Sequence, residues 1–371
     1  MASVPSPPPP ALTIGIDARA ASEVKAGRGR VVRELLRGLA AAEDPHRYVC
    51  YARTAWDEPL GDRFSWRLIG ARDPLWHALT ALRAGRECDV FLATNSYLSV
   101  ILTRVPAVAI VYDLVTFDPA MAPSRRSAVI ERLTLGTAVR RARAFVCISQ
   151  ATSEALTTHF PAAAGRITVA PLGVAPALSA PAAVELEALP EPGFVLAVGT
   201  LEPRKNLPRL VAAYGALDPN LQAAHRLVVV GASGWSTGPT VAALRSLGDR
   251  CLTLGHVSDA ALAELYRRCA VFCYPSLGEG FGLPVLEAMA AGAPVLTSSL
   301  SSLPEVGGQA AEYVDPHQVA SIAAGLDRVL GDPALRERLS CAGRRRAGEF
   351  SWQQFAERTL AVLQAAASSR S

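Results

Sequence analysis

The stretch YPSLGEGFGLPVLEAMAAG, residues 274–292, combines a strand end, a glycine turn and the start of a helix. The apolar run Val271–Tyr274 predicts a buried strand, and residues 284–291 predict a helix with Pro284 in its first turn. Glycines directly before a helix N-terminus expose backbone N–H groups at the positive end of the helix dipole. The stretch therefore predicts an anion-binding turn after a strand.

Two glutamates flank this turn in an E-x7-E spacing. Glu287 lies about one turn inside the predicted helix, and Glu279 lies outside its end. Carboxylates accept charge-assisted hydrogen bonds from paired hydroxyls, so a sugar nucleotide across the turn could meet one glutamate at its sugar and the other at its ribose. The alternative is a pair of acids that only complements the helix dipole, and the residues leave both interpretations open.

A basic loop, VGTLEPRKN at residues 198–206, follows the predicted strand Phe194–Val198. Its adjacent cations Arg204 and Lys205 suit phosphate, because arginine can fork onto it and lysine acts as a point charge. A solvated basic loop is the alternative. It is weaker for Lys205, because lysine occurs only at positions 25 and 205 while arginine is abundant.

Two further motifs lie in the first half of the chain. Gly27-Arg28-Gly29-Arg30 resembles a phosphate loop but is only G-x-G, and taken alone it favours an ordinary turn. In IVYDLVTFD, residues 110–118, Tyr112 and Asp113 end a predicted strand. Both motifs are candidates for the edge of a binding cleft.

Short apolar runs and amphipathic helical stretches alternate on both sides of the Ala/Pro-rich segment 175–193, which has the composition of a linker. The predicted strands are 11–16, 47–52, 88–93, 106–111 and 144–148 before the linker, and 194–198, 227–230, 251–254, 271–274 and 294–297 after it. Predicted helices include 29–42, 207–217 and 260–268, and helices fill the chain after residue 297. This pattern predicts an α/β fold of two doubly wound domains with a ligand cleft between them.

Composition excludes several classes of protein. Half of the 371 residues are apolar, which suffices for two cores, yet no run of about 18 uncharged apolar residues exists, so we expect no transmembrane span. The N-terminal MASVPSPPPP lacks the features of a signal peptide, and we expect a disordered Pro-rich tail at residues 1–10. Seven scattered cysteines without a C-x-x-C pair favour reduced thiols in the cytoplasm and no zinc site.

The charge is unequal along the chain. Residues 1–180 hold 21 Arg and Lys against 15 Asp and Glu, whereas residues 181–371 hold 16 against 18. A basic first half suits an anionic acceptor or the anionic inner face of the plasma membrane, with Arg125, Arg126, Arg140, Arg141 and Arg143 as contributors. An ordinary solvated surface is the alternative. We expect no nucleic-acid partner, because no basic run is interleaved with aromatics.

Taken together, YPSLGEGFGLPVLEAMAAGAPVLTS, VGTLEPRKNL, LGHVSDAALAELYRRC and AGRGRVVRELL resemble the family 4 glycosyltransferases, over about residues 11–360. The pattern is similar to that of bacterial mannosyltransferases and rhamnosyltransferases of surface polysaccharide assembly. The resemblance implies retaining enzymes of the GT-B fold, with two facing Rossmann-like domains. It implies an acceptor domain at residues 11–180, a nucleotide-sugar domain at 190–350 and a C-terminal helix at 351–371 that crosses back.

The resemblance also implies residue roles. Glu279 would contact the donor sugar, Glu287 would hold the ribose, and Lys205 assisted by Arg204 would stabilise the leaving diphosphate. The backbone of Gly280, Phe281, Gly282 and Leu283 would meet sugar and phosphate, Val257 would hold the base, and Gly27 and Gly29 would let the first domain approach the diphosphate. We place Asp113 with Glu279 and Lys205 as candidate catalytic residues.

The chain departs from the family pattern at two places. Thr200 stands where the family often has an arginine, and Arg204 is the candidate to compensate. Tyr112 stands where the family commonly has a histidine facing the donor sugar; it can donate a hydrogen bond but is a poor base at neutral pH. No D-x-D occurs, so we expect a metal-independent reaction without a cofactor, in which the nucleotide sugar is a co-substrate.

The leading hypothesis is therefore a cytoplasmic hexosyltransferase that uses a nucleotide sugar, GDP-mannose being the preferred choice, and a glycan or polyprenyl-linked acceptor. A sugar-nucleotide epimerase shares the architecture, but its chemistry usually needs more cleft histidines than a chain with six is expected to supply. A catalytically silent, glycosyltransferase-like binding protein is the other alternative, favoured by Tyr112 and Thr200. A dehydrogenase is disfavoured, because no G-x-G-x-x-G follows a strand.

Overall fold

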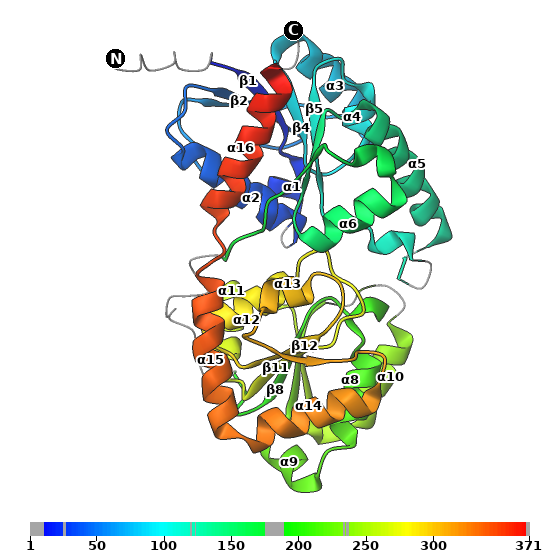
Figure 1. Ribbon diagram of the computed structural model, residues 1–371, viewed down its shortest axis with the longest axis vertical. Helices are drawn as coiled ribbons and strands as arrows, with labels where there is room; N and C mark the ends of the chain where they lie inside the picture. The colour runs from blue at the N-terminus through cyan, green and yellow to red at the C-terminus, as the bar shows by residue number, and fades with distance from the viewer. Residues whose placement is uncertain are drawn as a thin grey trace.

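The computed structural model describes residues 11–24, 27–118, 121–122, 124–174, 189–232, 234 and 237–368, apart from the side chain of Arg125. These residues form two parallel β-sheets, one of seven strands and one of six. Helices cover both faces of each sheet, and the two α/β halves lie one above the other along the long axis of the molecule (Figure 1). The architecture is that of two doubly wound domains.

The first sheet has the order β3-β2-β1-β4-β5-β6-β7, with every pair parallel. Its strands are β1 (Thr13–Asp17), β2 (Arg47–Ala52), β3 (Phe64–Leu68), β4 (Val90–Ala93), β5 (Ala107–Val111), β6 (Ala144–Cys147) and β7 (Ile167–Val169). Its helices are α1 (Arg19–Glu23), α2 (Arg28–Ala41), α3 (Leu75–Glu87), α4 (Leu98–Leu102), α5 (Arg125–Arg141) and α6 (Gln150–His159). The order reverses between β1 and β4, where a doubly wound sheet binds its ligands.

Alternate residues of these strands pack against different helix layers. Ile16 shares a core with Leu35 of α2 and with Phe355 of the C-terminal helix. Phe91 shares a second core with Leu135 of α5. Because successive strand residues point to opposite faces, a strand covered on both faces must be apolar throughout, which explains the short apolar runs in the sequence.

The second sheet repeats this arrangement with the order β10-β9-β8-β11-β12-β13, again all parallel. Its strands are β8 (Val195–Val198), β9 (Leu227–Val230), β10 (Cys251–Gly255), β11 (Val271–Tyr274), β12 (Val295–Ser298) and β13 (Glu312–Val314). Its helices are α8 (Leu207–Gly215), α9 (Pro219–Ala224), α10 (Gly238–Ser246), α11 (Asp259–Arg268), α12 (Leu283–Ala291), α13 (Leu303–Gly307), α14 (Val319–Gly331) and α15 (Pro333–Ala347). The switch point lies between β8 and β11, beside the quoted glycine turn.

The C-terminal helix α16 (Trp352–Ser368) returns to the first half and packs along α2 (Figure 1, red). Gly38 of α2 permits this contact, because a Cβ atom at Gly38 would lie 2.5 Å from the Cβ of Ala356. Arg358 also donates a hydrogen bond to the Val169 carbonyl at 3.1 Å. The chain thus crosses between the halves twice, once after β7 and once before α16.

The predicted strands agree with the observed ones to within two residues at each end. β3, β7 and β13 were not predicted, and the expectation that helices fill the chain after residue 297 is wrong at β13. These three strands lie at the edges of the sheets, where half-exposed residues weaken the apolar signal. The predicted tail at residues 1–10 and most of the predicted linker, residues 175–188, lie outside the described residues.

Gly38→Ala should lower the free energy of unfolding by about 1–3 kcal/mol, because the added methyl group overpacks the contact between α2 and α16. Gly85→Ala is the matched control, since Gly85 lies inside α3 and its added Cβ would meet only the Arg104 Cβ at 3.9 Å. The control should raise stability by about 0.4–1 kcal/mol. Denaturant unfolding of both variants measures the difference, and equal gains would show that α16 does not pack this closely on α2.

Candidate active site

A cleft of about 700 Å³ lies between the two halves. It is lined by residues at the ends of strands and the starts of helices in both halves. They include Gly27, Arg28, Arg30, Tyr112, Asp113, Gly199, Thr200, Arg204, Lys205, His256, Val257, Asp259, Tyr274, Glu279, Gly280, Phe281, Gly282, Leu283 and Glu287. This is where doubly wound sheets place their ligands. Most of the residues predicted from the sequence therefore face one shared cavity.

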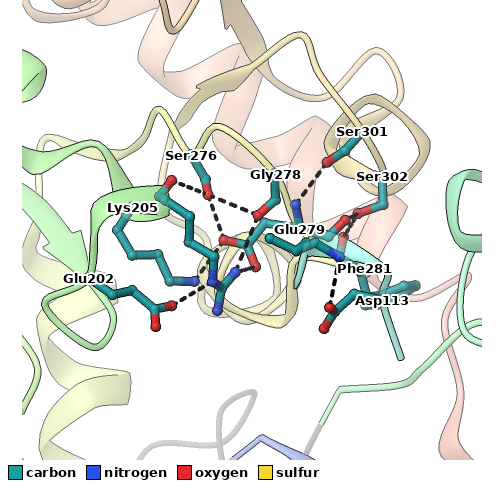
Figure 2. A network of polar contacts seen from close by, with 12 residues as sticks. Asp113, Glu202, Lys205, Ser276, Gly278, Glu279, Phe281, Ser301 and Ser302 are labelled. Atoms are coloured by element: carbon teal, nitrogen blue, oxygen red, sulfur yellow. Dashed lines mark hydrogen bonds and ion pairs between the residues drawn. The ribbon is translucent and has the colours of Figure 1, made fainter. Parts of the chain in front are cut away.

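Glu279 stands at the centre of a buried polar cluster (Figure 2). Its Oε1 pairs with Lys205 Nζ at 2.7 Å and accepts hydrogen bonds from the hydroxyls of Tyr274 at 2.8 Å and Ser276 at 2.7 Å. Arg204 pairs with the other carboxylate oxygen. Arg204 Nε also pairs with Oε1 of Glu202 at 2.5 Å. The Glu279 and Lys205 side chains are only 8% and 9% exposed, so a largely buried cluster holds two carboxylates and two cations.

The charges of this cluster determine one another. Burial alone would raise the pKa of Glu279, but Lys205 and Arg204 outweigh burial and lower that pKa to about 2. Burial lowers the pKa of Lys205, and Glu279 opposes that shift. Glu279 is therefore ionised at neutral pH, and it compensates cations that would otherwise be costly to bury.

Glycines let the loops reach this arrangement. Gly199, after β8, has a φ of +143°, and a Cβ there would lie 3.2 Å from Cε of Lys205, so its absence leaves room for the lysine stem. Gly280 lies against the first half, where a Cβ would be 1.9 Å from the Tyr112 carbonyl oxygen. Gly282 has a φ of +105° at the N-cap of α12. The GEGFG sequence is thus needed for backbone approach and for the turn into the helix.

Glu287 occupies a second charged cluster, on the first turns of α12. Its Oε1 pairs with Arg30 of α2, whose Nη2 also lies 2.8 Å from Oδ2 of Asp259 at the start of α11. Tyr266 donates a long hydrogen bond to Oε2 of Glu287, at 3.4 Å. Burial raises the pKa of Glu287 to about 7, while Arg30 opposes the shift. The guanidinium comes from one half of the molecule and the carboxylates from the other.

The structure places Gly29 outside the cleft lining, whereas Tyr112 lies directly after β5 and lines the cleft, as its place at a predicted strand end indicated. Gly29 is not among the cleft-lining residues of the described chain, and a Cβ there would be 1.7 Å from the Val24 carbonyl oxygen, so this glycine serves chain packing before α2. Tyr112 lines the cleft, but its hydroxyl is buried without a hydrogen-bond partner among the described residues, and Arg28 covers its ring at 5.2 Å. Its contact with the donor sugar stays a prediction.

Several residues of the site were not predicted. Tyr274 and Ser276 lie inside the quoted stretch, but no spacing rule marks them as partners of Glu279. Arg30 precedes Glu287 by 257 residues, and Asp259 looks like an ordinary helix-start acid. Only the folded chain brings these groups together.

Comparisons with known proteins agree with this geometry. A family model described as "Glycosyltransferase Family 4" matches residues 26–178, and one described as "Glycosyl transferases group 1" matches residues 184–346. The O-antigen chain mannosyltransferase B of Escherichia coli is 32% identical over 307 residues, which cover 80% of this chain and 78% of that protein. The chain belongs to glycosyltransferase family 4.

Other family relatives share part of this length. The MMP alpha-(1->4)-mannosyltransferase of Mycolicibacterium hassiacum is 35% identical over 230 residues, 59% of this chain and 53% of that protein. Two solved structures with the same fold are sucrose-phosphate synthase from Thermosynechococcus elongatus and the lipopolysaccharide glycosyltransferase WaaG. The synthase has a TM-score of 0.75 at 22% identity, and the match covers 94% of this chain and 97% of that one. WaaG has a TM-score of 0.72 at 17% identity, and the match covers 95% of this chain and 99% of that one. The fold is GT-B, the chain is a glycosyltransferase, and neither an epimerase nor a silent binding protein is favoured.

The low pKa of Glu279 predicts a pH-dependent contribution to stability. Its folded-state pKa of about 2 lies below the ordinary 4.5, so the stabilisation is complete above pH 4.5 and is lost as the pH falls toward 2. The stability advantage of wild type over Glu279→Gln should therefore be largest near neutral pH and should shrink below pH 4.5. Chemical unfolding between pH 3 and pH 7 measures it, with Glu337→Gln as the control because Glu337 is exposed on α15, away from the cluster. A constant advantage would contradict the ion pairing.

Proposed function

We propose that this glycosyltransferase transfers a hexose, with retention of configuration, from a nucleoside-diphosphate sugar to a glycan or polyprenyl-linked acceptor. GDP-mannose is the proposed donor, because several relatives are named mannosyltransferases. The observation that carries the proposal is the pair Glu279 and Glu287, which share one cleft with Lys205 and Arg204. The cluster suits an anionic, hydroxyl-rich ligand.

The donor would lie across the start of α12. Glu287 would accept hydrogen bonds from the ribose, Glu279 would accept them from the sugar, and the backbone from Gly280 to Leu283 would contact sugar and phosphate. Val257 lines the same cleft and would hold the base through its backbone. Gly27, with a φ of +53° at the N-cap of α2, would let the first half approach the diphosphate.

The chemistry follows from where charge develops. As the bond between the sugar and the diphosphate breaks, negative charge grows on the leaving phosphate oxygen, where Lys205 and Arg204 stabilise it without a metal ion. The acceptor hydroxyl attacks from the face that the diphosphate leaves, and its proton passes to that phosphate oxygen. The configuration at the sugar carbon is thereby retained.

A smaller pocket of about 310 Å³ adjoins the cleft in the first half and suits the acceptor. The two cavities share Arg28, Tyr112 and Asp113. The pocket is further lined by Asn95, Ser96, Tyr97, Ser127, Glu131 and Thr134, a polar set that fits sugar hydroxyls. Asp113 stands at the junction, where its carboxylate would orient the acceptor hydroxyl toward the donor.

Helix α5 forms one wall of this pocket and supports the proposed contact with an anionic membrane. Val129, Ile130 and Leu133 are 56%, 51% and 66% exposed, and exposed arginines 126, 132, 140 and 141 accompany them. Basic residues beside an apolar ridge suit the inner face of the plasma membrane. Arg125 was also predicted to contribute, but its side chain lies outside the described residues. In the described part of the chain no helix is both long and apolar enough to span a bilayer.

A transfer assay tests the function directly. Purified protein is incubated with GDP-mannose, UDP-glucose or TDP-rhamnose and a polyprenyl-linked saccharide, and product is followed by mass spectrometry. We expect sugar transfer from GDP-mannose with the anomeric configuration kept, and the same rate in EDTA. Hydrolysis or epimerisation without transfer would reject the function, and activity that EDTA abolishes and Mg²⁺ restores would reject the metal-independent reaction.

The two glutamates should respond differently to substitution. Glu279→Gln should lower turnover far more than donor affinity, because its sugar contact matters most where charge develops in the transition state. Glu287→Gln should mainly weaken donor and free nucleoside diphosphate, by about tenfold, because ribose contacts are alike in ground and transition states. Turnover and diphosphate affinity are measured for both variants. The reverse result would exchange the roles of Glu279 and Glu287. Equal, small effects on turnover and affinity would show that both glutamates serve only the structure.

Membrane binding should depend on α5 and on salt. Wild type should float with anionic liposomes at low salt and detach at high salt, because salt screens the arginines. Leu133→Ser should lower the binding by about tenfold, since it removes an inserting apolar group. Leu68→Ser, at a 53% exposed residue of edge strand β3, is the control and should bind like wild type. Binding that is indifferent to salt, or equal in both variants, would contradict the proposed surface.

A further inference from the structure

Arg30 connects the two halves of the molecule at the glutamate proposed to hold the ribose. It lies in the first turn of α2, and its two terminal nitrogens pair with Glu287 and Asp259 of the other half. The Arg30 and Glu287 side chains are 14% and 8% exposed, whereas Asp259 is 64% exposed. An exposed ion pair contributes little, whereas removal of one partner of a buried pair leaves an unpaired buried charge, so the contact with Glu287 is the important one.

The Glu287 carboxylate has few other partners in the described structure. Apart from Arg30, its charged or titratable neighbours are Asp259, which repels it, and Tyr266, which donates a long hydrogen bond of 3.4 Å to Oε2. Burial raises the pKa of Glu287 to about 7 even with Arg30 present. Without the guanidinium, the carboxyl group would lose the partner that favours its ionised form and fixes its Oε1.

We propose that Arg30 is a positioning residue for the donor, which reaches from the acceptor half to hold the Glu287 carboxylate ready to accept hydrogen bonds from the ribose hydroxyls. The inference rests on the proposed role of Glu287. It makes the ribose subsite a shared one, with the carboxylate on the nucleotide half and its counterion on the acceptor half. Discrimination for ribose then depends on the two halves being together.

A direct contact of Arg30 with the diphosphate predicts something different. If Arg30 bound the diphosphate itself, its loss would lower the affinity for every diphosphate equally, including inorganic pyrophosphate and whatever sugar is attached. A residue that acts through Glu287 affects only ligands that carry ribose hydroxyls. The two roles are therefore separable by ligands that differ in one hydroxyl group.

The experiment compares GDP with 2′-deoxy-GDP, and UDP with 2′-deoxy-UDP, by titration calorimetry. Wild type should prefer the ribose forms by about tenfold, the effect of one charge-assisted hydrogen bond. Arg30→Ala should bring the preference close to one and leave pyrophosphate affinity unchanged. Arg30→Lys, which keeps a charge but loses the fork, should be intermediate. Arg37→Ala is the control, because Arg37 lies on the same helix and pairs with Glu34 and Glu58 within its own half.

Three results would overturn the inference: no ribose preference in wild type, an unchanged preference in Arg30→Ala, or an equal loss of pyrophosphate affinity. Adding Arg30→Ala to Glu287→Gln should change the preference no further, since the two residues act as a unit. Thermal unfolding checks that each variant is folded. If the wild type transfers no sugar but its ribose preference depends on Arg30, the proposed function fails and this inference stands.

Discussion

Two carboxylates buried in one cleft must each be paired with a cation, and much of the site follows from this constraint. An unpaired buried charge costs several kcal/mol, so the fold must bring positive groups to Glu279 and to Glu287. Lys205 and Arg204 reach Glu279 from the turn after β8. Arg30 reaches Glu287 from the other half of the chain. Loops distant in sequence are thus fixed by the electrostatics of the space between them.

The backbone around Gly280 makes this pairing possible. Its Cα lies against the end of β5, and its carbonyl oxygen accepts hydrogen bonds from the hydroxyls of Ser149 at 2.6 Å and Thr152 at 3.1 Å, at the start of α6. Glu305 of the second half accepts from the Gln150 N–H group at 2.9 Å and 2.8 Å, which satisfies the same helix end. These contacts between the halves therefore border the glycine turn before α12, so a ligand bound at that turn would act directly on the interface.

Local patterns predicted the fold well because each signal is contained within a few residues. Buried parallel strands produce short apolar runs, and the glycine turn before α12 is visible in GEGFG. The edge strands β3, β7 and β13 were not visible, and neither was the pairing of the glutamates with their cations, because both depend on contacts between distant segments. Gly29 shows the same limit: its spacing resembled a phosphate loop, but its missing side chain makes room for the Val24 carbonyl. Lys205 could be singled out because lysine is rare in this chain.

The ion pairs of the cleft also bear on which anions it can accept. Under the proposed function, a diphosphate must draw Lys205 and Arg204 away from Glu279, a competitor that is tethered beside them. A singly charged anion gives these cations no more negative charge than the Glu279 carboxylate already provides. A diphosphate offers more charge and several acceptor oxygens, and the sugar hydroxyls it carries donate to the carboxylate that it displaces. Only a ligand with both parts replaces the contacts that Lys205, Arg204 and Glu279 make with one another, so these ion pairs favour a nucleotide sugar over its separate anionic fragments.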